Sequence, residues 1–265
     1  MNSFLNMLKF RPHAIHLIME GKKLSETAKK SICQLYDSVQ RGIKYEISSK
    51  YLDKGLQVED QSIEEVKKIK FGYDPKWSLQ QFREYKAIEY KKNTITFKND
   101  WLIGTPDILY TDSIGNREYI VVDDVKNSYT RATWLYSVSQ IVENRTVIDA
   151  YYWQLQAYMM LTGAEDSNLI YCLMNTPFEI VESEKRKSFY KLGNESEFEN
   201  IEKMHNFDNL PLNQRFFITN VQRNNSDIEK IKDKVEQAND WIEKYIKFNF
   251  KEKNEHLHEN SAFEV

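Results

Sequence analysis

The chain is poor in residues that cross-link a fold or bind metals through sulfur. Its 265 residues include only two cysteines, together with five prolines and eight glycines. Two cysteines so far apart in the sequence cannot ligate an iron–sulfur cluster or a four-cysteine zinc site, and they give no sign of an oxidising compartment. The five histidines form no metal-ligand pattern with either cysteine. We therefore do not expect zinc.

Long apolar runs and a strong excess of one charge are also lacking. No run of about 18 apolar residues is present, so a membrane span is not expected. The N-terminal region lacks the basic-then-apolar order of a secretory signal. We therefore expect a soluble, cytoplasmic protein with no membrane partner. The net charge of −3 shows none of the global positive charge of many nucleic-acid binders, although local pairs of basic residues remain.

The composition does supply a sizeable core. Hydrophobic residues make up 41% of the chain and aromatic residues 13%, which is enough for one large α/β domain. We expect a single domain over residues 1–250 and a polar tail over 251–265. Within the domain, a helical part covers about 1–45, a core about 46–176, and a strand-helix extension about 177–250.

Apolar residues at helical spacing indicate several helices. The expected helical segments are 1–45, 46–69, 146–162, 178–210 and 228–245. Ser25, with Thr27, offers an N-terminal cap, and Gly163 is expected to end the helix over 146–162. The segment between residues 126 and 146 reads as a long connection.

Short β-branched and aromatic runs indicate the strands. Segments 93–97, 101–110 and 119–126 predict a three-stranded meander, and 169–174 and 215–221 predict two further strands. The turn formers at 112–116 are typical of an antiparallel hairpin.

The end of the segment 119–126 is the most informative feature. An apolar strand there ends in two acids and a lysine, where an unpaired buried charge costs several kcal/mol. Such charges are usually tolerated where they hold a metal ion or perform chemistry. Because side chains alternate along a strand, we expect Asp124 and Lys126 on one face and Val125 on the other.

The hairpin brings a second acid to the same place. Asp107 follows Pro106 on the preceding segment, so folding at 112–116 places Asp107 beside Asp124. Two carboxylates and the backbone carbonyl of Val125 make an oxygen site suited to Mg²⁺ or Mn²⁺. Lys126 lies next to it. An ordinary salt bridge at the strand end is the alternative interpretation.

Acid-x-lysine triplets alone carry little information in this chain. Four others occur in charged helical or loop segments, where a solvated face is the expected role: 65–67, 74–76, 84–86 and 89–91. The triplet at Asp124 differs because it ends an apolar run and has a Pro-Asp one hairpin upstream.

The order helix, meander, helix, strand and the motifs within it resemble the PD-(D/E)-x-K nuclease superfamily. Asp107 matches the first acid, Asp124 the second acid, and Lys126 the lysine. The segments 55–59 and 154–158 further resemble the branch that contains phage lambda-type recombination exonucleases and RecB-type nuclease domains. The resemblance covers roughly residues 45–175.

The resemblance adds three site residues. It implies that Glu59, on the helix before the sheet, is a catalytic residue and a third metal ligand; an ordinary rim glutamate is the alternative. Gly55, one turn earlier, lacks a side chain and would allow a strand or ligand to approach. Gln154 and Tyr158 lie at i, i+4 on a helix and are implied to steady the lysine or the DNA strand, although core packing with a satisfied hydroxyl explains them equally well.

The implied fold is a restriction-endonuclease-like core, with a central mixed β-sheet flanked by helices. The implied function is a Mg²⁺-dependent DNA exonuclease, with Mn²⁺ as a substitute, that leaves 5′-phosphates in phage-type recombination or repair. The implied partners are double-stranded DNA ends, a homo-oligomer such as a trimer, and a single-strand annealing protein in a bacterial host cell. A structure- or sequence-specific endonuclease and a non-catalytic DNA-binding module are the alternatives. Ser25 and Arg131 could grip a terminal phosphate, but a helix cap and a surface salt bridge are simpler roles.

Overall fold

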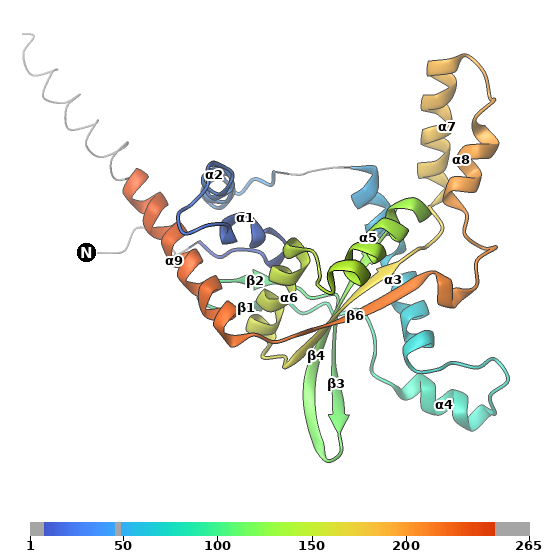
Figure 1. The fold of residues 1–265 in the computed structure, drawn as a ribbon, viewed down its shortest axis with the longest axis horizontal. Helices are drawn as coiled ribbons and strands as arrows, with labels where there is room; N and C mark the ends of the chain where they lie inside the picture. Colours follow the sequence, from blue (N-terminus) through green and yellow to red (C-terminus); the bar gives the residue numbers. More distant parts are fainter. Residues whose placement is uncertain (1–7, 46–48, 247–265) are drawn as a thin grey trace, which may run out of the picture.

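A four-stranded mixed sheet forms the centre of the molecule (Figure 1). The computed structural model describes residues 8–45 and 49–246. The strands lie in the order β3-β4-β5-β6, where β3 and β4 are antiparallel, β4 and β5 parallel, and β5 and β6 antiparallel. Their bounds are β3 Ile108–Ile114, β4 Arg117–Asn127, β5 Asp166–Cys172 and β6 Phe216–Gln222. The expected α/β fold with a central mixed sheet is confirmed.

Helices flank this sheet on both faces (Figure 1). Those before the sheet are α1 His16–Met19, α2 Glu26–Arg41, α3 Lys50–Lys70 and α4 Leu79–Ala87, preceded by the 3₁₀ turn η1 Pro12–Ala14. Those after β4 are α5 Arg131–Asn144, α6 Asp149–Thr162, α7 Phe178–Leu192, α8 Phe198–His205 and α9 Asn225–Ile246, with the 3₁₀ turn η2 Leu212–Gln214 before β6. The predicted cap is confirmed, because Ser25 accepts a hydrogen bond from the Ala28 N–H.

Alternation along β4 divides its side chains between two cores. Val122 packs with α6 residues such as Leu155 and Met159 in one core. Val121 and Val125 pack with residues of α3 in the core on the opposite face. Asp124 lies on the same face as Val122, because side chains alternate along a strand, and it therefore points towards α6.

Helix α6 is apolar on more than one side, and the structure shows why. One side packs on the sheet, while Ala157 and its neighbours join a third core built from α1, α2, α9 and the segment around Phe10. A helix that is covered all round carries no polar face. The helix ends as predicted at Gly163, whose φ of 76° fits the left-handed C-cap conformation.

The predicted three-stranded meander is wrong in its middle segment. The residues 101–110 do not form one strand: β2 (Ile103–Gly104) pairs with β1 (Phe97–Lys98) in a separate small sheet, and β3 starts only at Ile108. Pro106 lies in the break and has no N–H to contribute to a ladder. The chain therefore changes direction just before Asp107.

The expected long connection after β4 is also wrong. Residues 131–144 form helix α5, which starts from a reciprocal cap between Thr130 and Thr133. The predicted polar tail over 251–265 lies outside the described residues. Across the part of the chain that the structure describes, no helix is both long and apolar enough to cross a membrane.

The first of the two adjacent acids of β4 supports the fold. Asp123 is fully buried on the face towards α3, where its carboxylate accepts three hydrogen bonds. The donors are Lys70 Nζ at 2.6 Å, Tyr90 Oη at 2.7 Å and Asn168 Nδ2 at 2.7 Å. A buried carboxylate with three donors is stable where it is, and it has no free oxygen to offer a ligand.

We predict that Asp123→Ala lowers the free energy of unfolding by about 3–5 kcal/mol, because it leaves the largely buried Lys70 ammonium without its counterion. Glu118→Ala, on the exposed part of the same strand, should change it by less than about 0.5 kcal/mol. Urea unfolding curves measure both values. Equal effects of the two substitutions would contradict a supporting role for Asp123.

Candidate active site

Asp107 lies where the small sheet passes into the central sheet, and its side chain reaches across to β4. Its Oδ2 accepts a hydrogen bond from the Val125 N–H at 2.8 Å. The last residue pair between β3 and β4 is Ile108 with Asp123, so Asp107 and Asp124 stand one step beyond it, opposite each other. Opposite residues of an antiparallel pair share a face. The predicted meeting of Asp107 and Asp124 is therefore confirmed.

Asp124 is completely buried, and its two oxygens have different surroundings. Oδ1 accepts a hydrogen bond from Gln154 Nε2 at 3.0 Å. Oδ2 has no hydrogen bond of suitable geometry within the described residues, although the Lys126 ammonium lies 2.5 Å away. Among the described residues, the lysine is therefore the one partner of this buried oxygen.

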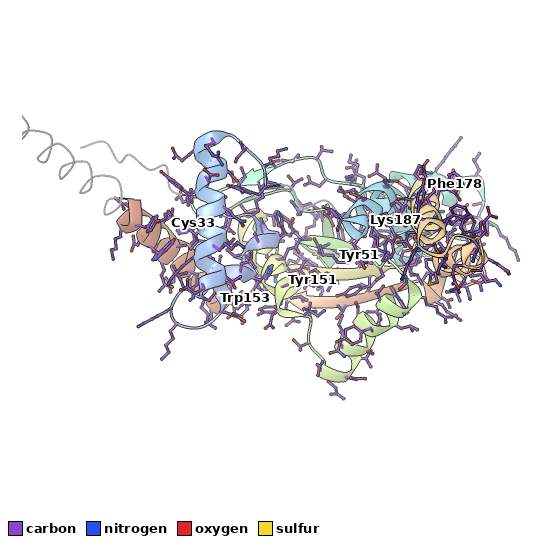
Figure 2. The ribbon with its side chains drawn as sticks, turned by 90° about the horizontal axis from the view of Figure 1, so that it is seen from above. Cys33, Tyr51, Tyr151, Trp153, Phe178 and Lys187 are labelled. Atoms are coloured by element: carbon purple, nitrogen blue, oxygen red, sulfur yellow. The ribbon has the colours of Figure 1, made fainter. Side chains whose placement is uncertain are left out.

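Lys126 is held beside both acids. Burial works to lower the pKa of Lys126, but the carboxylates of Asp124 and Asp107 outweigh it, and the pKa is raised. Its ammonium also lies 5.2 Å from the centre of the Tyr151 ring, on the first turn of α6 (Figure 2). The side chain is therefore a fixed positive charge next to the carboxylates.

The site supplies the oxygen donors that a hard cation requires. In a strand, the N–H and C=O of one residue point the same way. Since the Val125 N–H points at Asp107, its carbonyl points to that side as well. Asp107, the Oδ2 of Asp124, which is paired with Lys126 alone, and the Val125 carbonyl thus fit Mg²⁺ or Mn²⁺ in donor chemistry.

Glu59 approaches this group from α3 without joining it. Its carboxylate lies 3.3 Å from Lys92 Nζ, and its charge is close enough to Asp107 to help raise the pKa of that carboxyl. Within the residues described, no three acidic, histidine or cysteine side chains come together closely enough to hold a metal ion. A role for Glu59 as metal ligand and catalytic residue stays a prediction.

Gln154 and Tyr158 are both buried and support the site from α6. Gln154 holds Asp124, while the Tyr158 hydroxyl donates to the carbonyl of Thr105 at 3.1 Å. Direct contact of these two side chains with DNA stays a prediction. No strand approaches Gly55 closely: among the described residues, nothing outside the adjoining turns of its own helix lies within 4 Å of the space its Cβ would fill, and approach by a ligand stays a prediction.

The glycine that does permit a close approach is Gly104. A Cβ there would lie 2.6 Å from Pro12 Cδ and 3.3 Å from Tyr158 Cε1. Pro12 and its neighbours thus rest on the segment that leads into Asp107. Sequence reasoning missed this contact because about 90 residues separate its two sides.

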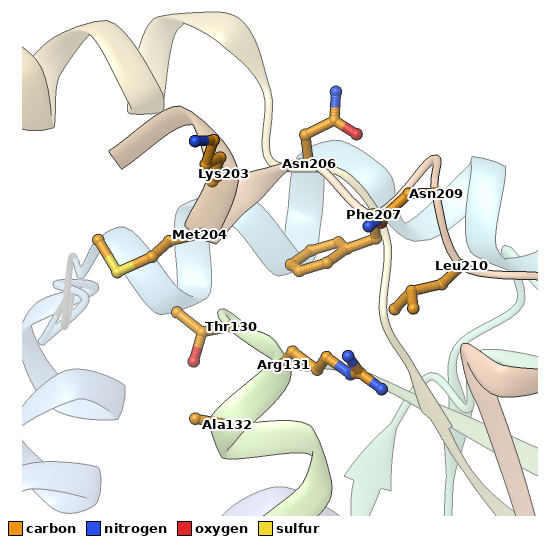
Figure 3. Close-up of a pocket in the computed structure, with 9 residues that line it drawn as sticks. All are labelled: Thr130, Arg131, Ala132, Lys203, Met204, Asn206, Phe207, Asn209 and Leu210. Carbon is orange, nitrogen blue, oxygen red and sulfur yellow. The ribbon is translucent and has the colours of Figure 1, made fainter. Parts of the chain in front are cut away.

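A hollow that contains Arg131 opens just past the end of β4 (Figure 3). It measures about 250 Å³ and is lined by Thr130, Arg131, Ala132, Lys203, Met204, Asn206, Phe207, Asn209 and Leu210. No acidic side chain lines it. The salt bridge considered for Arg131 is not formed with any described residue. Arg131 instead faces this hollow, while Ser25 is used as a helix cap.

Solved structures share this architecture. A phage-related exonuclease from Haemophilus somnus 129PT superposes with a TM-score of 0.64 at 23% identity, covering 91% of this chain and 96% of that one. The chain has the fold of this exonuclease. An alkaline exonuclease from Laribacter hongkongensis gives a TM-score of 0.56 at 14% identity, covering 95% of this chain and 96% of that one. The structure of its complex with dAMP gives a TM-score of 0.58 at 15% identity, again covering 95% of this chain and 96% of that one. The predicted resemblance is thus confirmed at the level of the fold.

Sequence comparison alone finds no such likeness: no family profile and no curated protein matches this chain. The exonuclease fold is therefore visible through the arrangement of the sheet and helices, and the site residues rest on the geometry described above.

We predict that affinity for Mn²⁺ rises with pH. Burial, and then the charge of Asp124, raises the pKa of Asp107 from its ordinary value of 3.8 to about 7. The folded, metal-free chain therefore keeps a proton that the unfolded chain loses, and its stability falls as pH rises from about 4 to 7. Metal binding needs the ionised carboxylate, so affinity increases through the same window.

Calorimetric titration with Mn²⁺ should show roughly tenfold weaker binding at pH 6 than at pH 8, since a group with a pKa of about 7 is mostly protonated at the lower pH. Equal affinity at the two pH values would show that Asp107 is not a ligand.

Proposed function

We propose that this chain is a Mg²⁺-dependent DNA exonuclease that hydrolyses phosphodiester bonds from DNA ends. The observation that carries the proposal is the meeting of Asp107, Asp124 and Lys126 at the ends of β3 and β4. The likeness to exonuclease structures over more than 90% of the chain supports it.

The roles follow from the geometry. Asp107, Asp124 and the Val125 carbonyl would hold the metal, with Glu59 as a further ligand, direct or through water. When bound, Mg²⁺ polarises a phosphate and lowers the pKa of a coordinated water. Lys126 orients the attacking water and stabilises negative charge on the phosphate oxygens, because its raised pKa keeps it protonated. Gln154 fixes Asp124 so that one oxygen remains available.

DNA is the proposed substrate despite the net negative charge of the chain. Two positive side chains lie near the end of β4: Lys126 within the site, and Arg131 in the hollow that follows β4, where Lys203 is paired with Glu199. This hollow suits a phosphate of the bound strand. We propose products with 5′-phosphates, action in phage-type recombination or repair in the cytoplasm of a bacterial host, and assembly with copies of itself, such as a trimer, and with an annealing protein.

The first test compares linear duplex DNA with the closed circular form of the same plasmid. An exonuclease should degrade the linear form in Mg²⁺, leave the circle intact, and lose all activity in excess EDTA. Gel electrophoresis over time measures both substrates. Cleavage of the circle as fast as the linear form would show an endonuclease.

The second test removes the central carboxylate. Asp124→Ala should lower the cleavage rate by at least about a thousandfold, because the metal loses its buried ligand, while DNA binding measured by fluorescence anisotropy persists. Asp112→Ala, on the exposed part of the sheet, should cleave at the normal rate. Nuclease activity that survives the Asp124 substitution would rule out this site, and binding without cleavage by the unsubstituted chain would indicate a non-catalytic module.

A further inference from the structure

The segment before α1 forms part of the border of the site. Phe10 is buried and pairs with the small sheet: its N–H donates to the Trp101 carbonyl at 2.9 Å, and its own carbonyl accepts from the Ile103 N–H at 3.0 Å. Two backbone hydrogen bonds and a buried aromatic ring fix the course of the chain here. The turn η1 follows directly.

Pro12 continues this attachment. It packs against Gly104, with Tyr158 on the same glycine, and Tyr158 in turn binds the Thr105 carbonyl. The turn η1 is thus held against α6 and against the segment that leads into Asp107. His13, in the middle of the turn, is carried to the side of the site by contacts that do not involve its own side chain.

The two histidines of this segment differ in what they do. His16 turns back, and its Nδ1 lies 3.0 Å from the carbonyl of His13. The His13 side chain is exposed, and its ring forms no hydrogen bond with any described residue. An imidazole that is carried on a fixed backbone and is itself uncommitted is available to an external partner.

The charges around His13 indicate what that partner is. Loss of hydration, and then the positive charges of Arg11 and Lys126, lower the pKa of His13, while Asp124 acts weakly in the opposite direction. The ring is therefore neutral at pH 7, with one N–H to donate, in surroundings where two cations favour an anion and oppose a metal ion.

We propose that the His13 imidazole donates a hydrogen bond to a non-bridging phosphate oxygen of the DNA strand held at Asp107, Asp124 and Lys126. This inference rests on the proposed function and adds a contact from the N-terminal side of the site. The phosphate is thereby bound between Lys126, on the sheet, and His13, on η1.

The test measures duplex DNA binding by fluorescence anisotropy with Ca²⁺ in place of Mg²⁺, and single-turnover cleavage in Mg²⁺. His13→Ala should weaken binding and slow cleavage at subsaturating DNA by roughly tenfold, the usual effect of losing one hydrogen bond to a charged group. His13→Gln, which keeps an N–H donor, should recover most of the loss. The matched control His16→Ala should behave as the unsubstituted chain.

Thermal unfolding and Mn²⁺ affinity should be the same for His13→Ala and the unsubstituted chain, which separates a DNA contact from a structural role. If the unsubstituted chain cleaves DNA, and His13→Ala binds and cleaves DNA as well as His16→Ala does, the inference fails and the proposed function stands. If His13→Gln binds and cleaves DNA no better than His13→Ala, the proposed hydrogen bond is wrong. If the unsubstituted chain neither binds nor cleaves DNA, both fail.

Discussion

The hydrogen bond from the Val125 N–H to Asp107 determines the geometry of the whole site. Beyond the pair of Ile108 with Asp123, no described strand pairs with β4 on that side, and the Asp107 carboxylate supplies the acceptor that a strand would have provided. The bond aligns Asp107 with Asp124 and, because the two polar groups of Val125 point the same way, directs its carbonyl to the same place. One side-chain-to-backbone contact thus arranges all three oxygen donors.

The two neighbouring acids of β4 show how the pleat separates support from chemistry. Asp123 points towards α3 and meets three donors, so its charge is fully compensated by the protein. Asp124 points towards α6 and meets one amide and one ammonium, so one of its oxygens remains short of a hydrogen bond. Residue type and burial are the same in both positions. The difference lies in the number of donors within reach: Asp123 meets one from α3, one from the segment after α4 and one from β5.

Much of the fold and the centre of the site could be predicted because they depend on local patterns. The apolar run before Asp124, the turn formers of the hairpin, the cap at Ser25 and the end of α6 at Gly163 all follow from short stretches of sequence. The break at 105–107 could not, because it depends on which strand Ile103 joins. Helix α5 was missed because it has a weak amphipathic pattern. Pro12 on Gly104, and with it the placement of His13, is a contact between distant segments that no local pattern reveals.

An internal counterion compensates the charge of the facing carboxylates in the folded chain. Two carboxylates that face each other at the end of a buried sheet repel one another unless a cation lies between them. The ammonium of Lys126, 2.5 Å from Asp124, is that cation in the chain by itself. Under the proposed function, a divalent ion at Asp124 would compensate this charge in its turn, and the Lys126 ammonium would face the bound phosphate. The lysine thus supplies, from within the chain, the positive charge that keeps Asp124 in position.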